Sequence, residues 1–89
     1  MNIKGNIRQK IAQALDIPRE IALDAPKIVM IGNGELCVEN YKGVLEYENH
    51  VIRIKTSVDV LRVEGSGLEI CAITDEEIQI RGRISALSF

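Results

Sequence analysis

The sequence predicts a mainly β fold, an antiparallel β-sandwich of about eight short strands preceded by a short helical segment. From residue 27 onward, apolar and polar residues alternate in short runs, which is typical of strands that expose one face to water. The runs begin about every eight residues, and turn-forming residues separate several of them, a spacing found in all-β sandwiches and barrels. The length of 89 residues allows one such domain.

Residues 1–26 are predicted to form an amphipathic helical arm, and residues 27–89 the β domain. The apolar residues of the arm recur at helical spacing on one face; this apolar stripe consists of Ile3, Ile7, Ile11 and Leu15. Pro26 ends the arm, because a proline disfavours helical geometry in the residue before it. A helix this short is marginal on its own, so the stripe must rest on a surface. That surface is either its own sheet, with the arm as a lid, or another molecule, with the arm as an attachment.

The alternating pattern recurs along the whole β domain. Its runs cover residues 28–31, 35–40, 43–48, 51–56, 60–65, 68–73, 77–82 and 83–89. The turn signals between them are Gly32-Asn33-Gly34, Glu48-Asn49-His50, Gly65-Ser66-Gly67 and Thr74-Asp75-Glu76. The pair Asn33-Gly34 is the strongest hairpin signal, because both residues accept positive φ angles.

One parity of each run is apolar and the other is charged, so the predicted sheet has one face for a core and one for solvent. The predicted core face consists of Leu36, Val38, Leu45, Tyr47, Ile52, Ile54, Leu61, Val63, Leu68, Ile70, Ile78 and Ile80. Such a face has to be covered, either by the sheet folding over on itself, by the arm or by a second subunit. The regular spacing also fits a β-solenoid. A sandwich is preferred because the runs share no repeat beyond their alternation.

The sequence contains no recognisable catalytic, cofactor-binding or metal-binding motif, and we expect a protein that is not an enzyme. The one histidine, His50, lies in a predicted turn, where a solvated side chain is the usual role. Neither Cys37 nor Cys71 belongs to a CxxC motif, so metal ligation and nucleophilic catalysis lack partners at suitable spacing. The acidic run 75–77 fits an exposed turn better than a calcium loop, which needs ~6–8 oxygen ligands at defined spacing.

Composition argues against several partners and locations. The net charge is −2 and aromatic residues make up 3%, whereas nucleic-acid-binding domains need a basic face and stacking rings. The chain has no apolar run as long as the ~18 residues that a transmembrane helix needs. Two cysteines are too few for a disulfide framework. We therefore expect reduced thiols and a cytoplasmic protein that binds no nucleic acid and has no transmembrane segment.

The loop between the second and third runs is a candidate partner-binding site. Asn40 and Gly43 suit a tight turn, and Tyr41 and Lys42 are expected to project from it. An aromatic residue beside a cation on a loop is typical of a recognition tip. The alternative is that Tyr41 folds back onto the sheet. The candidate partner-binding residues are thus the apolar stripe together with Asn40, Tyr41 and Lys42.

Several segments of the chain together resemble a known family. They are Ile17-Pro18-Arg19-Glu20, Asp24-Ala25-Pro26-Lys27-Ile28, Ile31-Gly32-Asn33, Val38-Glu39-Asn40-Tyr41-Lys42-Gly43-Val44-Leu45 and Glu77-Ile78-Gln79-Ile80-Arg81-Gly82-Arg83-Ile84, with Leu87 and Phe89. From residue 16 to residue 89 the sequence is similar to the YqfC branch of the YabP/YqfC family of bacterial endospore-formation proteins. The turn at Ser57-Val58-Asp59 departs from the family pattern, because it lacks the glycine expected of many relatives.

The resemblance implies an all-β protein made in the mother cell during spore formation, with a membrane-associated sporulation protein as its genomic neighbour, and we expect that neighbour to be its partner. It supplies no catalytic residue. We therefore expect an assembly or adaptor module that is cytoplasmic in the mother cell and peripheral at the forespore outer membrane, with homo-oligomerisation as an option. The alternative is a small-ligand-binding or regulatory domain, which a deep cavity lined by a few polar groups would favour.

Overall fold

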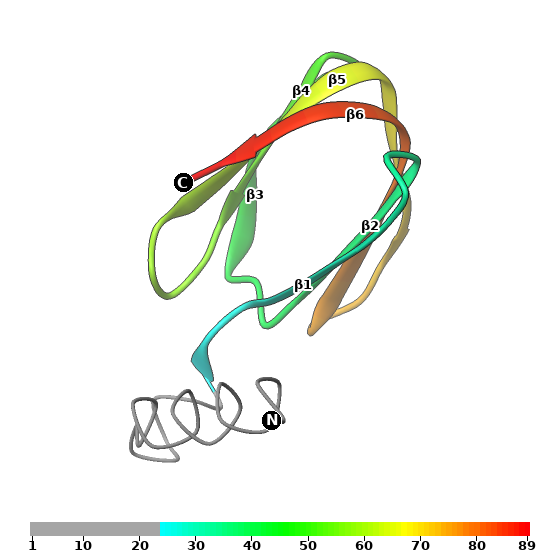
Figure 1. Cartoon of the computed structure of the whole chain (residues 1–89). Coiled ribbons are helices and arrows are strands. Elements are labelled where there is room, and N and C mark those ends of the chain that lie inside the picture. Colours follow the sequence, from blue (N-terminus) through cyan, green and yellow to red (C-terminus); the bar gives the residue numbers. More distant parts are fainter. Residues whose placement is uncertain (1–23) are drawn as a thin grey trace, which may run out of the picture.

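The computed structural model describes residues 24–89, which form one antiparallel sheet of six strands (Figure 1). The strands are β1 (Lys27–Ile31), β2 (Glu35–Glu39), β3 (Gly43–Tyr47), β4 (Val51–Lys55), β5 (Val60–Ile73) and β6 (Glu77–Ser88). Their order is β1-β2-β6-β5-β4-β3, and every neighbouring pair is antiparallel. The predicted mainly β, antiparallel class is confirmed. The apolar stripe of the arm lies outside the described residues.

The sheet has six strands where the sequence predicted about eight, because predicted runs merge into two long strands. β5 joins runs 60–65 and 68–73, and β6 joins runs 77–82 and 83–89. The segment Gly65-Ser66-Gly67, predicted to be a turn, lies inside β5, where the pairing with β6 changes register. Glycines inside a strand favour bulges that bend it without ending it. The alternative of a β-solenoid, whose coils stack in parallel, does not describe this antiparallel sheet.

The long strands bend near their middles, so that β1 and β2 face β3 and β4 across the concave side of the sheet (Figure 1). Close backbone approach at the bend requires glycine. A Cβ on Gly65 would lie 1.9 Å from the carbonyl oxygen of Arg83, and one on Gly82 would lie 2.6 Å from that of Gly67. Gly82 also has a φ of 135°, which residues with a side chain rarely adopt. The sheet therefore bends strongly but remains one open sheet, so the predicted sandwich of two layers is not confirmed.

Two hairpin turns cap the bend through backbone hydrogen bonds. The β3–β4 turn accepts from β5, since the N–H of Leu68 donates to the carbonyl oxygen of Asn49 at 2.8 Å. The β1–β2 turn accepts from β6, since the N–H of Ile84 donates to the carbonyl oxygen of Asn33 at 2.8 Å. Each long strand thus keeps a backbone partner where its neighbouring short strand has ended.

A core of apolar side chains lies on the concave side of the bent sheet. Its buried members are Leu36, Val38, Ile52, Ile54, Leu61, Val63, Leu68, Ile78, Ile80 and Ile84. This agrees with the predicted core face except for Leu45 and Tyr47 on β3, which are each 50% exposed, and Ile70, which packs against the core only partly buried; Ile84 joins the core without having been predicted. β3 changes register against β4 between Val44 and Glu46, and a bulge breaks the simple alternation counted along a chain. Val44 packs against the core in place of Leu45.

Two turns are closed by threonine side chains. In the β4–β5 turn, Thr56 Oγ1 accepts a hydrogen bond from the N–H of Asp59 at 3.2 Å and donates one to its carbonyl oxygen at 2.6 Å. In the β5–β6 turn, Thr74 Oγ1 accepts from the N–H of Glu77 at 3.1 Å. A threonine hydroxyl that bonds the backbone nearby stabilises a turn. The turn at residues 57–59 therefore forms without the glycine that its relatives were expected to carry.

Candidate functional site

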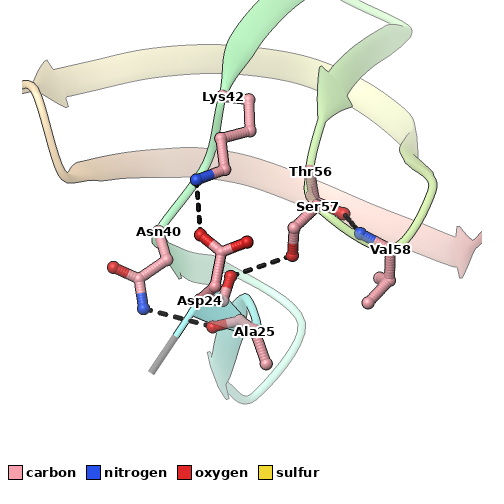
Figure 2. A network of polar contacts seen from close by, with 7 residues as sticks. All are labelled: Asp24, Ala25, Asn40, Lys42, Thr56, Ser57 and Val58. Atoms are coloured by element: carbon pink, nitrogen blue, oxygen red, sulfur yellow. Dashed lines mark hydrogen bonds and ion pairs between the residues drawn. The ribbon is translucent and has the colours of Figure 1, made fainter. Parts of the chain in front are cut away.

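Two loops converge on the residues that lead into β1 (Figure 2). Lys42 Nζ, from the β2–β3 loop, lies 2.6 Å from Asp24 Oδ1. Ser57 Oγ, from the β4–β5 turn, donates a hydrogen bond to the carbonyl oxygen of Asp24 at 2.8 Å. Asn40 Nδ2 donates to the carbonyl oxygen of Ala25 at 3.1 Å. These five residues, which we call the junction clamp, define where the chain enters the sheet.

Asn40 holds its place in the junction clamp through an unusual backbone conformation. Its φ is 61°, a left-handed region in which asparagine is tolerated better than most residues. Its backbone N–H donates to the carbonyl oxygen of Glu76 at 2.7 Å. The main chain of Asn40 is thus tied to the β5–β6 turn, while its side chain bonds to Ala25.

The structure separates the three loop residues singled out in the sequence. Asn40 and Lys42 meet in the junction clamp. Tyr41 instead folds back onto the sheet, packs partly buried against the core and donates its hydroxyl hydrogen to the carbonyl oxygen of Thr74. This is the alternative considered for Tyr41 above.

The junction clamp is a set of weak contacts in a solvated place. The side chains of Lys42 and Asp24 are 44% and 55% exposed, and an exposed ion pair contributes only about 0–1 kcal/mol to stability. The hydrogen bonds from Asn40 and Ser57 to backbone carbonyl oxygens fix the orientation of the main chain at residues 24–25, because a hydrogen bond requires a particular donor–acceptor geometry. The junction clamp therefore orients the chain more than it stabilises the sheet.

A second group, on the outer face of the sheet, brings a thiol next to two carboxylates. Ligand atoms of Cys37, Glu39 and Glu77 lie within 4.8 Å of one another. Burial raises the pKa of the Cys37 thiol, and the negative charge and hydrogen bonding of Glu77 and the charge of Glu39 raise it further. The thiol therefore holds less thiolate at neutral pH than an ordinary cysteine, which disfavours nucleophilic attack. These three donors also fall short of the four that a structural zinc site uses.

Sequence reasoning missed this outer-face group because its members come from strands far apart in the chain. β2 pairs with β6, which places Glu39 opposite Glu77 and Cys37 opposite Gln79. No residue spacing along the chain predicts that β2 pairs with β6. The sequence did indicate that Cys37 and Glu39 lie on the same outer face, because they are two residues apart in one predicted strand.

The two cysteines cannot form a disulfide within this fold. Cys37 lies on β2 and Cys71 on β5, and β6 runs between these strands. Two strand spacings of ~4.8 Å separate their backbones by about 9.6 Å, which exceeds the ~7 Å limit for a disulfide. Cys71 instead donates a weak hydrogen bond from Sγ to the carbonyl oxygen of Gln79 at 3.4 Å. Both thiols are free.

The same outer face carries a shallow hollow of about 140 Å³. It is lined by Val29, Ile31, Glu35, Leu36, Cys37, Cys71, Gln79, Ile80 and Arg81. Pockets for small ligands usually measure ~300–1,000 Å³ and enclose the ligand. This hollow is smaller and open, so it does not have the form of a metabolite site.

The remaining polar candidate, His50, lies in the β3–β4 turn. Its Nε2 is 3.3 Å from Glu48 Oε2, and these side chains are 65% and 54% exposed. Its Nδ1 lies 3.3 Å from Asn49 Oδ1. Among residues 24–89, no helix has the length and apolar character needed to span a bilayer.

Comparison with known proteins gives one relative and one family. The chain is 28% identical over 86 residues to the uncharacterized protein YqfC of Bacillus subtilis (strain 168), a match that covers 97% of this chain and 92% of the relative. The comparison with solved structures gave no significant match. The YabP family model matches residues 23–89, a range that contains the junction clamp and every described strand. The chain therefore belongs to the YabP family.

Proposed function

We propose that this protein is a sporulation protein that acts without catalysis, as an assembly or adaptor module at the mother-cell face of the forespore membrane. Membership in the YabP family suggests the process. The observation that carries the mechanism is the junction clamp, which orients the chain just after residues 1–23. The arm predicted for that segment would then leave the sheet at one defined place and dock on a membrane-associated sporulation protein.

The interior of the fold supports an adaptor over a small-ligand-binding domain. Apolar side chains fill the concave side of the sheet, and Thr56 is the one buried polar residue among residues 24–89. Its hydroxyl is already bonded within its own turn. A ligand site needs a cavity with convergent polar groups, and the described core offers neither.

The arm is the part of the chain through which the proposal is tested. Ile11→Asp puts a charge into the apolar stripe, and Gln13→Asp puts the same charge into the same segment outside the stripe. We expect a fluorescent fusion of the Ile11 variant to disperse from the forespore membrane and its yield of heat-resistant spores to fall at least tenfold. The Gln13 variant should behave as the parent.

Thermal melting of the purified proteins separates docking from folding. An attachment arm predicts that Ile11→Asp and the parent melt within about 2 °C of each other, because the sheet keeps its own core. If the Ile11 variant stays at the membrane and sporulates normally, the adaptor proposal is wrong. If it fails to fold, the arm is a lid on the sheet and the proposed attachment is likewise wrong.

A further inference from the structure

The two edges of the sheet differ in their protection against a further strand. On β3 the pairing changes register between Val44 and Glu46, and Glu46 carries a charge in the middle of the strand. Bulges and charges of this kind keep an edge from pairing with another chain. On β1 all five residues pair with β2 without any change of register, and four of them, Ile28 to Ile31, are apolar. Within the sheet formed by residues 24–89, the β1 edge is the one without such protection.

The apolar side chains of β1 are exposed although the strand belongs to the sheet. Val29, Met30 and Ile31 are 43%, 40% and 65% exposed. Val29 and Ile31 lie on the outer face, whereas Met30 lies on the core face opposite Leu36. A strand that exposes apolar side chains on both faces, beside a row of free backbone groups, is a template for another strand.

We propose that β1 is a homodimerisation strand, which pairs antiparallel with β1 of a second copy about a two-fold axis at Val29. Each Val29 then lies opposite its counterpart, and Lys27 lies opposite Ile31 of the second copy. The two sheets become one continuous sheet. The exposed apolar side chains of β1 are buried between the copies, which is the main driving force for such an association.

Charge complementarity supports a second copy as the occupant. Among residues 24–89, Lys27 makes no ion pair, although Glu39 is its neighbour across β2, and Glu35 is 3.7 Å from Arg81, which is a loose contact. Within one copy Glu35 is the neighbour of Ile31 across β2. Pairing about Val29 therefore sets Lys27 on the outer face opposite Ile31 of the second copy, with Glu35 of that copy on the next strand, two strand spacings or about 9.6 Å away between backbones. The two-fold axis repeats the attraction between Lys27 and Glu35 in the other direction, so the β1 edge is complementary to its own copy.

The described part of the chain, residues 24–89, leaves room for this pairing. The tip of the β1–β2 hairpin bonds to β6 through the carbonyl oxygens of Asn33 and Gly34. β6 lies on the side of β2 away from β1. The tip is thus drawn away from the free edge of β1, and the end of a second β1 can pass beside it.

Light scattering on the full chain after size exclusion tests the dimer. The parent should have a mass near twice the 9.9 kDa of one chain. Val29→Lys places two like charges opposite each other at the axis and should halve the mass. Val58→Lys makes the same change at a more exposed residue of the β4–β5 turn and should leave the dimer intact. A monomeric parent, or a Val29 variant that stays dimeric, overturns the proposal.

Charge-exchange variants and a cross-linking variant test the register. Lys27→Glu and Glu35→Lys should each weaken the dimer at least tenfold, and the double variant should restore it, because the charges are exchanged across the axis. In a Cys37→Ser, Cys71→Ser background, Val29→Cys should cross-link fully under mild oxidation, since opposed residues lie ~4.5–5.5 Å apart. Absence of both rescue and cross-link rules out this pairing. Because these measurements use purified protein, they stand apart from the proposed role of the arm.

A chain that is monomeric alone but captures a strand of another protein would also contradict the second-copy pairing. Mixing the parent with a peptide of the β1 sequence distinguishes the cases. If the dimer exists, an excess of this peptide should convert it to monomers that carry the peptide, and a scrambled peptide should not. Failure of the matched peptide to bind would likewise count against β1 as the interface.

Discussion

The hydroxyl of Tyr47, on β3, accepts a hydrogen bond from the backbone N–H of Ile70, on β5, at 2.9 Å. These strands are separated by β4 in the sheet, and β4 pairs with β5 only as far as Glu64. The second half of β5 has therefore lost its neighbour on that side. Tyr47 reaches across the bend and bonds an N–H group that no strand covers. It ties the two halves of the folded sheet together.

Removal of the Tyr47 hydroxyl tests whether its hydrogen bond with the Ile70 N–H connects the two halves of the sheet. Tyr47→Phe keeps the ring and deletes the acceptor for the Ile70 N–H. We expect the free energy of unfolding in urea to fall by about 0.5–1 kcal/mol, the net value of one hydrogen bond whose groups are partly solvated. Glu48→Gln, in the adjoining turn, should change it by less than about 0.5 kcal/mol. Equal effects would show that the hydroxyl does not connect the halves.

The two faces of β4 should respond differently to truncation. Ile54 is fully buried, so Ile54→Ala should lower the free energy of unfolding by about 2–5 kcal/mol through lost burial and the cavity left behind. Arg53, on the outer face, pairs with Glu46 at 2.8 Å, with side chains 40% and 33% exposed. Arg53→Ala should cost less than about 1 kcal/mol. Chemical denaturation of both variants decides whether the faces are assigned correctly.

The glycine at the bend should not tolerate a side chain. Gly82→Ala places a Cβ 2.6 Å from the carbonyl oxygen of Gly67, at a φ of 135°. Both strain and steric overlap oppose it, and we expect a loss of about 3 kcal/mol or more. Gly43→Ala is the matched control, because no atom lies within 4 Å of its added Cβ. A Gly82 variant as stable as the Gly43 variant would mean that the bend adapts freely.

The reactivity of Cys37 should reveal the carboxylates beside it. Its raised pKa means that less thiolate is present at any given pH below that value. In a Cys71→Ser background, the rate of alkylation should rise with pH along a curve displaced to higher pH. Glu77→Gln removes a negative charge that raises the pKa, so its curve should move to lower pH. Glu69→Gln, on β5, is the control and should leave the curve in place. An unmoved Glu77 curve would contradict this electrostatic origin.

The inside and outside of most strands are readable from the chain. Side chains alternate along any strand whatever its partner is, so Ile52 and Ile54 point to one face and Arg53 to the other before any pairing is known. The same local reasoning indicates the hairpin turn at residues 32–34 and the exposed turn at the acidic run 75–77. These features depend on neighbouring residues only, and the structure has both turns. They differ in detail, because the positive φ angle of the first turn lies at Gly32 and not at Asn33 or Gly34, and Glu77 already begins β6.

Tertiary pairing decided the rest. Glycine permits both a turn and a bulge, so Gly65 and Gly67 alone do not say whether β5 ends or bends. It bends because both halves keep β6 as their partner. On β3 the bulge beyond Val44 appears only against β4. Cys37 and Glu77 become neighbours because β6 inserts between β2 and β5, an order that no local pattern encodes, since strand order depends on which distant segments bury their apolar faces together.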